Sequence, residues 1–459
     1  MDCFRTCDLR GIYPDEIDEP LFYRLGQEIA FQHLSRDKSV LIGCDWRLSS
    51  PPLREALLEG LVESGARVLD AGAVPTPLIY FGKRRLGLGT AAVVTASHNP
   101  PEYNGLKLLL ENGPASPEQI VQLRRNIRAA RCKRPGGSVE SINLMELYQS
   151  HTVANWGRRF AEPRPRAAGP YVLDPGNGVW SGLAVQIFRA LGIRCQAIHD
   201  EPDGTFPNRS PDCAAPGSLS RLATSVRQSH AAAGIAWDGD GDRLAICDDT
   251  GAVLSTDRLA LLLIPELVPK DGQDRILLDV KMSRKVKAAV ESRGAIPLVE
   301  KSAHCLLEQT MIREDCLFGC EYSGHLFFRE LGGSDDGMHS ALVAVDFLER
   351  SGSLLSQLVE RLPKIFATPD IRFPGGAREF HEIERRVLDG LPQARIQRLD
   401  GLMLELPRAW FVLRRSASEK KLSWRFEADT ADDLHSLVHD TMILLPQYRD
   451  LLATGLAGQ

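Results

Sequence analysis

Apolar and polar positions alternate along the chain in blocks that predict strands and helices in turn. An apolar run at residues 40–44 predicts a buried strand, and Ser50 followed by two prolines predicts the start of a helix. Leucines at helical spacing follow until Gly65, after which the next strand is expected from Val68. This strand–helix–strand order predicts an α/β domain with a parallel sheet.

A second apolar run, at residues 90–95, gives way to small and polar residues and then to two prolines. The run is too short for a helix and predicts a buried strand, whereas paired prolines permit neither strand nor helix. Ser97 is therefore expected on a stiff loop beyond the carboxyl end of a strand, where open α/β sheets bind ligands. With His98 beside it and Lys107 near in sequence, Ser97 is a candidate nucleophile or phosphoryl carrier.

The strand–helix rhythm continues after a polar passage at residues 157–169, and it changes near residue 366 to alternating strand-like segments and mixed helices. We expect three α/β domains and a smaller C-terminal α+β domain, at residues 1–150, 151–252, 253–365 and 366–459. Direct comparison of the blocks reveals no repeat in the sequence itself. The charged segment at residues 4–14 is expected to be a loop rather than a core strand.

Three aspartates, Asp238, Asp240 and Asp242, alternate with glycines directly after an apolar strand expected at residues 234–237. Residues two apart point the same way in extended backbone, and the glycines let the chain curl, so three carboxylates can face one point. Carboxylate oxygens suit Mg²⁺ better than zinc, and the glycine and glutamate of an EF-hand calcium loop are absent from their positions. The pattern predicts a magnesium site; a turn rich in aspartate and glycine for conformational reasons alone is the alternative.

A phosphate transferred beside these carboxylates would need concentrated positive charge. Arg243, Lys281, His98 and Lys107 are candidate sources, because they recur in segments near predicted strand ends. A Ser-His-Asp hydrolase is disfavoured, since residues 95–100 lack the Gly-x-Ser-x-Gly elbow.

Two further polar segments suit a phosphorylated polyol. Glu321, Ser323 and His325 stand between apolar runs and offer acceptors and donors to sugar hydroxyls, although a polar hairpin turn explains them equally. A basic segment near the C-terminus offers donors for a phosphate, and a solvated basic turn explains it almost as well. Its candidate residues are Arg414, Ser416 and Ser418, with Lys420 and Lys421 nearby.

Composition narrows the classes of function. The chain has 459 residues, 43% of them hydrophobic and 25% charged, and a net charge of −5, which is typical of a soluble globular protein and gives no basic face for nucleic acid. The polar start does not match a signal peptide, and the longest apolar run, at residues 259–264, is too short to cross a membrane. Ten cysteines lie scattered without a Cys-x-x-Cys pair, so we expect a reduced, cytoplasmic setting with most cysteines as small core residues.

Taken together, these residues resemble the α-D-phosphohexomutase family, in particular its phosphomannomutase/phosphoglucomutase branch. The matching motifs cover nearly the whole chain in the family's order: residues 4–11, 95–100, 238–243, Lys281, Lys301 with His304, 321–325 and 414–418. The resemblance implies three related α/β domains with mixed sheets and a fourth domain that together enclose a central cleft. It also implies an intramolecular phosphotransferase that interconverts hexose 1-phosphate and hexose 6-phosphate of mannose, glucose or both.

In the mechanism that the resemblance implies, phosphorylated Ser97 gives its phosphoryl group to the sugar, and a hexose 1,6-bisphosphate turns over and returns the other phosphate. Mg²⁺ and the bisphosphate are the implied cofactors, and the sugar phosphate is the implied partner. The implied catalytic residues are Ser97, His98, Lys107, Arg243, His304 and Arg10. The implied metal ligands are Ser97, Asp238, Asp240 and Asp242. The implied substrate-binding residues are Arg243, Lys281, Lys301, Ser302, His304, Glu321, Ser323, His325, Arg414, Ser416 and Ser418.

Some residues depart from the family pattern. Cys7 replaces a usual tyrosine, Ala303 a usual glycine, and Ala417 and Lys420 an asparagine and a proline. Three alternatives therefore stay open: a phosphoglucosamine mutase, a metal-dependent sugar phosphatase, and a non-catalytic protein that binds sugar phosphates. The sequence leaves the preferred hexose and the oligomeric state undetermined.

Overall fold

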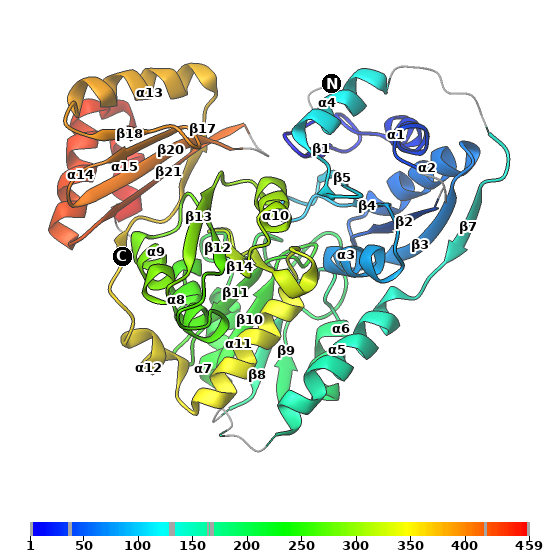
Figure 1. The fold of residues 1–459 in the computed structure, drawn as a ribbon, viewed down its shortest axis with the longest axis horizontal. Coiled ribbons are helices and arrows are strands. Elements are labelled where there is room, and N and C mark those ends of the chain that lie inside the picture. Colours follow the sequence, from blue (N-terminus) through cyan, green and yellow to red (C-terminus); the bar gives the residue numbers. More distant parts are fainter. Residues whose placement is uncertain are drawn as a thin grey trace.

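The protein is described from a computed structural model, which covers residues 3–34, 39–127, 134–162, 165, 169–416 and 420–456. Within these ranges the strands form four sheets, each built from one consecutive stretch of the chain (Figure 1). In the view of Figure 1 the first and fourth sheets occupy the two upper ends of the molecule, with the second and third below them. No helix in the described ranges has the length and apolar character needed to cross a bilayer.

The first sheet has the strand order β1-β5-β4-β2-β3-β7, with β6 paired to β5. Its strands are β1 (Asp8–Ile12), β2 (Ser39–Cys44), β3 (Arg67–Ala73), β4 (Thr90–Val94), β5 (Tyr103–Leu110), β6 (Gly113–Pro114) and β7 (Ser138–Ser141). Its helices are α1 (Glu19–Gln32), α2 (Ser50–Glu63), α3 (Thr76–Arg85), α4 (Pro117–Asn126) and α5 (Leu144–Ala161). The helix predicted from Ser50 is α2, whose N-cap is Ser49, one residue earlier than expected.

The second and third sheets have the orders β11-β10-β8-β9 and β13-β12-β14-β15. The second contains β8 (Tyr171–Asp174), β9 (Cys195–Ala197), β10 (Ala233–Trp237) and β11 (Leu244–Cys247), with α6 (Leu183–Ala190) and α7 (Ser220–Ser229). The third contains β12 (Arg275–Asp279), β13 (Ile296–Glu300), β14 (Phe318–Cys320) and β15 (Leu326–Phe328). Around it lie α8 (Thr256–Leu267), α9 (Arg284–Ser292), α10 (His304–Arg313), η1 (Arg329–Leu331), α11 (Gly337–Ser351) and α12 (Leu355–Glu360).

These three sheets share one topology. In each, a central strand (β2, β8 or β12) has a parallel partner on both sides, and the later partner (β4, β10 or β14) continues into an antiparallel strand (β5, β11 or β15). The sheets are therefore mixed, and the repeat that is invisible in the sequence exists in the strand order. This agrees with the expectation of three related α/β domains.

The fourth sheet is antiparallel, with the order β16-β21-β20-β19-β18 and β17 paired to β21. Its strands are β16 (Phe366–Ala367), β17 (Ile371–Pro374), β18 (Arg395–Gln397), β19 (Leu402–Glu405), β20 (Ala409–Arg415) and β21 (Lys421–Ala428). Its helices are α13 (Ala377–Gly390), α14 (Ala431–Leu444), η2 (Pro446–Tyr448) and α15 (Arg449–Leu456). A separate apolar core between this sheet and its helices confirms the α+β character of the C-terminal part, while the predicted domain boundaries stay predictions.

The amino-terminal segment corrects one prediction. It contains β1, which pairs antiparallel with β5, whereas the sequence predicts a loop. Leu9 is fully buried, and Asp8 and Arg10 form an ion pair with each other, so the charges that suggested a solvated loop are satisfied within the strand. The strand fits against β5 because Gly105 there has no side chain: a Cβ at this position would lie 1.9 Å from the carbonyl oxygen of Leu9.

Candidate active site

Three loops with candidate chemistry occupy the same position in the shared topology. Each links a parallel strand to the antiparallel strand that follows it: β4 to β5 through Ser97, β10 to β11 through residues 238–243, and β14 to β15 through residues 321–325. Carboxyl ends of parallel strands form the edge where α/β sheets bind ligands. The three loops open on one cleft with about 940 Å³ of open space, whose walls include residues from all four sheets or their loops.

Arg47, which is fully buried, holds the Ser97 loop through hydrogen bonds to its backbone. The Arg47 guanidinium donates to the carbonyl oxygens of Ser97 and Asn99 at 2.8 and 2.5 Å, and it pairs with Asp45 at 3.1 Å. Ser97 itself has a φ of +50°, which few residues other than glycine adopt. This conformation and the hydrogen bonds from Arg47 hold the backbone that carries the Ser97 hydroxyl.

The Ser97 hydroxyl points to the aspartate loop and donates to Asp238 Oδ2 at 2.8 Å. The two loops approach closely because residue 239 is a glycine, where a Cβ would lie 2.6 Å from the Ser97 carbonyl oxygen. All three aspartates are buried, with at most 1% exposure. The structure thus brings together the carrier candidate and the three carboxylates that the sequence places in separate domains.

The aspartate loop fits a hard cation. The carboxylate oxygens of Asp238, Asp240 and Asp242 come within 4.8 Å of one another, and one oxygen each of Asp240 and Asp242 is buried without a hydrogen-bond partner. Burial and the neighbouring carboxylates raise the pKa of Asp238 well above its usual range, so the cluster needs positive charge to stay ionised. Oxygen donors with unused lone pairs are what Mg²⁺ binds.

Lys107 on β5 supplies part of that charge. Its ammonium donates to Asp240 at 2.6 Å and to Asp242 at 2.5 Å. Burial would disfavour ionisation of all three groups, but the ion pairs outweigh it, so the pKa of Lys107 is raised and the pKa values of Asp240 and Asp242 are lowered. Lys107 therefore contacts the predicted metal ligands.

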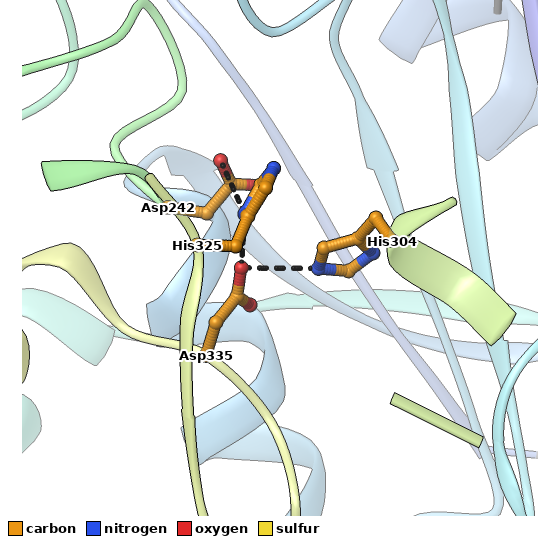
Figure 2. A group of neighbouring side chains, drawn as sticks. All are labelled: Asp242, His304, His325 and Asp335. Atoms are coloured by element: carbon orange, nitrogen blue, oxygen red, sulfur yellow. Dashed lines mark hydrogen bonds and ion pairs between the residues drawn. The ribbon is translucent and has the colours of Figure 1, made fainter. Parts of the chain in front are cut away.

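A second cluster lies directly beside the aspartates (Figure 2). Asp335 Oδ2 lies 2.5 Å from His325 Nδ1 and 3.0 Å from His304 Nε2, while His325 Nδ1 lies 3.6 Å from Asp242 Oδ1. Arg243 Nε donates to His325 Nε2 at 2.9 Å and lies 3.7 Å from Asp238. This network joins the predicted metal-binding loop, residues 238–243, to the predicted sugar-binding turn, residues 321–325, called the sugar turn below.

The two imidazoles differ in charge. Burial lowers the pKa of His304, but the Asp335 carboxylate and its hydrogen bond outweigh this and raise it to about 9. Burial and the Arg243 guanidinium lower the pKa of His325 well below its usual value. Burial also raises the pKa of Asp335, whereas the His304 imidazolium opposes this rise. His304 is therefore the imidazole of this pair that holds a proton at neutral pH, and it faces the cleft.

His98 differs from its prediction as a source of positive charge. It is buried beside Ser97, and burial together with Arg243 lowers its pKa well below the usual value. Its Nδ1 lies 3.7 Å from Asp212. The arrangement favours a neutral hydrogen-bonding imidazole over a cation.

The sugar turn faces the cleft with unused polar atoms. One carboxylate oxygen of Glu321 and the Ser323 hydroxyl are buried without a hydrogen-bond partner. Ser302 Oγ donates to Asp279 at 3.1 Å and lies 3.4 Å from Glu321. Buried polar atoms of this kind are rare unless a ligand or water satisfies them.

The fourth domain closes the cleft with cations. Arg414 donates to the Ser302 carbonyl oxygen at 2.7 Å and pairs with Asp400. Arg372 also lines the cleft and, like Lys281 from the third domain, pairs with Asp370, at 3.0 and 3.2 Å. Positive charge from the third and fourth domains therefore lines the same cleft as Ser97, which suits a phosphate.

The cleft brings together most of the predicted residues. Its walls include Arg10, Ser97, His98, Lys107, Arg243, Lys281, Ser302, His304, Glu321, Ser323, His325, Arg414 and Ser416. Lys301 does not join them: it is exposed and lines a neighbouring hollow beside Arg415. Ser418 lies outside the described residues.

Among the residues at this site that sequence reasoning misses are Asp335, Arg372 and Arg47. Asp335 belongs to a conspicuous Gly-Ser-Asp-Asp-Gly segment, which was a usable signal, but nothing local ties it to His304. Arg372 and Arg47 carry no local motif.

One covalent contact crosses the cleft wall. Cys7 forms a disulfide with Cys305, 298 residues away, with a Cα–Cα distance of 6.2 Å. This pair departs from the expectation of reduced core cysteines. The other cysteines in the described ranges are free, and all but Cys195 among them are buried.

Comparisons with known proteins agree with this geometry. Three family models, described as phosphoglucomutase/phosphomannomutase alpha/beta/alpha domains I, II and III, match residues 1–133, 153–251 and 255–366. The phosphomannomutase/phosphoglucomutase of Pseudomonas aeruginosa is 33% identical over 438 residues, which cover 95% of this chain and 93% of that protein. The phosphoglucomutase of Neisseria gonorrhoeae is 31% identical over 441 residues, which cover 94% of this chain and 93% of that protein.

The fold comparison gives the same picture. A crystal structure of a phosphoglucomutase/phosphomannomutase family protein from Burkholderia thailandensis superposes with a TM-score of 0.82 at 30% identity, and 97% of each chain is covered.

Proposed function

Because the chain belongs to the phosphoglucomutase/phosphomannomutase family and has a phosphohexomutase function, we propose that it interconverts the 1- and 6-phosphates of glucose, mannose or both through a phosphorylated Ser97. The observation that carries the proposal is the hydrogen bond of 2.8 Å from Ser97 to Asp238, at the centre of a buried three-carboxylate cluster. An acyl-transfer serine has no use for such a cluster, whereas a phosphoserine does.

The residues present fit Mg²⁺. Asp238, Asp240, Asp242 and an oxygen on Ser97 would hold the ion, since they offer only oxygen donors and two of these are unsatisfied. When bound, Mg²⁺ would supply positive charge to the transferring phosphoryl group.

The chain's own groups account for the rest of the first transfer. The P–O bond to Ser97 breaks as a bond forms to a sugar hydroxyl oxygen; a base takes the hydroxyl proton, and an acid supplies a proton to the leaving Ser97 oxygen. Lys107 and Arg243 stand beside the carrier and would stabilise the charge on the phosphoryl oxygens. His304, aligned by Asp335 and protonated at neutral pH, is the candidate that this structure favours for the acid, with Lys107 and Arg10 as the other proton-transfer candidates.

The second transfer needs the same sugar reversed. The bisphosphorylated sugar turns over, and its original phosphate moves to Ser97. We assign the holding of the distal phosphate to Arg414, Ser416, Lys281 and Arg372, because these residues line the same cleft as Ser97 and offer cationic and hydroxyl donors. Glu321 and Ser323 would hold sugar hydroxyls in either orientation. The cytoplasmic location also stays a prediction.

The test is an incubation of the protein with glucose 1-phosphate, Mg²⁺ and glucose 1,6-bisphosphate, with mannose 1-phosphate in parallel. We expect hexose 6-phosphate without inorganic phosphate. Inorganic phosphate as the main product would instead identify a phosphatase, and no product from either sugar would contradict the proposal. Ser97→Ala should abolish turnover and remove one phosphate from the intact mass, whereas Ser138→Ala, on the exposed strand β7, should change neither.

A further inference from the structure

Cys7 belongs to the first domain and Cys305 to the third, yet their side chains are close enough to form a disulfide. Their Cα atoms are 6.2 Å apart, within the range of about 4.4–6.8 Å that disulfides require. Both side chains line the cleft that contains Ser97. Small molecules that enter the cleft can therefore reach this pair.

Both cysteines adjoin candidate functional groups. Cys305 follows His304 at the start of α10, and Cys7 precedes β1, whose Arg10 donates to the Ala96 carbonyl oxygen in the carrier loop at 2.6 Å. A bond between the two sulfurs thus joins the segment that supports Ser97 to the helix that carries His304.

The remaining described cysteines differ from this pair. Burial raises the pKa of Cys44 to about 12 and that of Cys316 to about 11, which leaves them as unreactive thiols. Cys195 is the one half-buried free thiol among the described residues, and it lies on β9, in the second domain. The structure therefore singles out one pair for chemistry.

We propose that Cys7 and Cys305 are a reversible oxidation site that ties the first domain to the third across the cleft. A small disulfide, such as oxidised glutathione, is the oxidant. One protein thiolate attacks it, releases one small thiolate and forms a mixed disulfide; the second protein thiolate then displaces the other small thiolate. The two protein thiols lose two electrons and two protons, and the two small thiols gain them.

The tie restrains the cleft walls. Gln309 Nε2 on α10 already donates to the Pro114 carbonyl oxygen of the first domain at 3.0 Å. The disulfide adds a second link, which fixes the distance between α10 and the segment before β1. A bisphosphorylated sugar must turn within these walls, so the oxidised protein turns over severalfold more slowly. This last consequence rests on the proposed function, whereas the tie itself does not.

The experiment compares the full-length protein after treatment with dithiothreitol and with oxidised glutathione. Proteolysis without reduction should yield one peptide pair linked through Cys7 and Cys305, two hydrogens lighter than the free peptides. Amide exchange in β1 and at the start of α10 should slow on oxidation, and turnover should fall severalfold and recover with dithiothreitol. Cys7→Ser and Cys305→Ser should each lose the linked pair and the response to oxidant, whereas Cys195→Ser should respond like the parent.

Absence of the linked pair after oxidation would overturn the proposal. So would an oxidised, linked protein that turns over as fast as the reduced one. If neither form has mutase activity, the proposed function fails, while the linked pair and slower exchange still establish the tie.

Discussion

At the scale of single residues, Asp335 controls the charge of His304. The substitution Asp335→Asn removes the carboxylate that raises the pKa of His304 to about 9. The effect of burial then dominates, and we expect the pKa of His304 to fall toward or below about 6.5. The alkaline limb of the turnover–pH profile should move to lower pH with it. NMR titration of the His304 ring, together with that profile, measures both effects.

The same shift has a signature in stability. Because the folded pKa of His304 exceeds its unfolded value, its contribution to the free energy of unfolding is complete below about pH 6.5 and is lost as pH rises through about 9. Asp335→Asn should remove this dependence, and Asp440→Asn, on the exposed face of α14, should retain it. A His304 pKa that is unchanged by Asp335→Asn would show that another group sets it.

Residues of this kind mark the limit of prediction from sequence. Ser97 and the three aspartates could be predicted because each stands in a local pattern, a strand followed by a loop of turn residues. Asp335 could not be linked to His304, since the contact spans 31 positions and depends on two elements packing together. Arg372 could not be found at all from its neighbours in the sequence.

At the scale of elements, the pairing of β1 with β5 depends on Gly105. A methyl group there would meet the Leu9 carbonyl oxygen at 1.9 Å, so Gly105→Ala must separate the two strands. We expect the free energy of unfolding to fall by about 2 kcal/mol or more. Urea denaturation followed by circular dichroism measures this change.

The matched control is Gly157→Ala in α5, where a Cβ would meet nothing within 4 Å. Alanine favours the helix, so this variant should gain about 0.5–1 kcal/mol. Equal urea midpoints for Gly105→Ala and the parent would contradict the role given to this glycine.

Several strands and the helix that starts near Ser50 follow from the sequence pattern, but the order of the strands in the sheets does not. The apolar runs at residues 40–44 and 90–95 match β2 and β4 closely. Pairing of β1 with β5 was not predictable, because an ion pair within the strand and a glycine on its partner replace the apolar pattern. The topology common to three sheets is a property of strand neighbours, and no residue pattern encodes it.

At the scale of the whole molecule, Arg425 anchors the fourth domain. This buried side chain on β21 pairs with Asp257 at 2.5 Å, and its guanidinium lies 4.2 Å from the centre of the Tyr322 ring in the sugar turn. Arg425→Gln leaves the Asp257 carboxylate buried without a cation, which typically costs about 3–5 kcal/mol. We expect a lower melting temperature and a larger radius of gyration by small-angle scattering.

Arg408→Gln is the control for this change. Arg408 pairs with Asp433 on the surface, where its side chain is 61% exposed, so its loss should cost less than about 1 kcal/mol and leave the radius unchanged. If Arg425→Gln scattered and melted like the parent, other contacts would have to hold the fourth domain. The sequence could not predict this anchor, because its two charges lie 168 positions apart.

The consecutive arrangement of the four sheets has a consequence for synthesis of the protein. The ribosome delivers Ser97 first, then the aspartates, then the sugar turn, and Arg414 last, since the chain emerges from its amino terminus. A nascent chain therefore contains Ser97 and the three aspartates well before the fourth sheet, which carries Arg372 and Arg414. A translation stop that removes the fourth sheet would release a protein that keeps Ser97, the three aspartates and Lys281 but lacks Arg372, Arg414 and Ser416. On the proposed function, we expect such a protein to release the sugar bisphosphate.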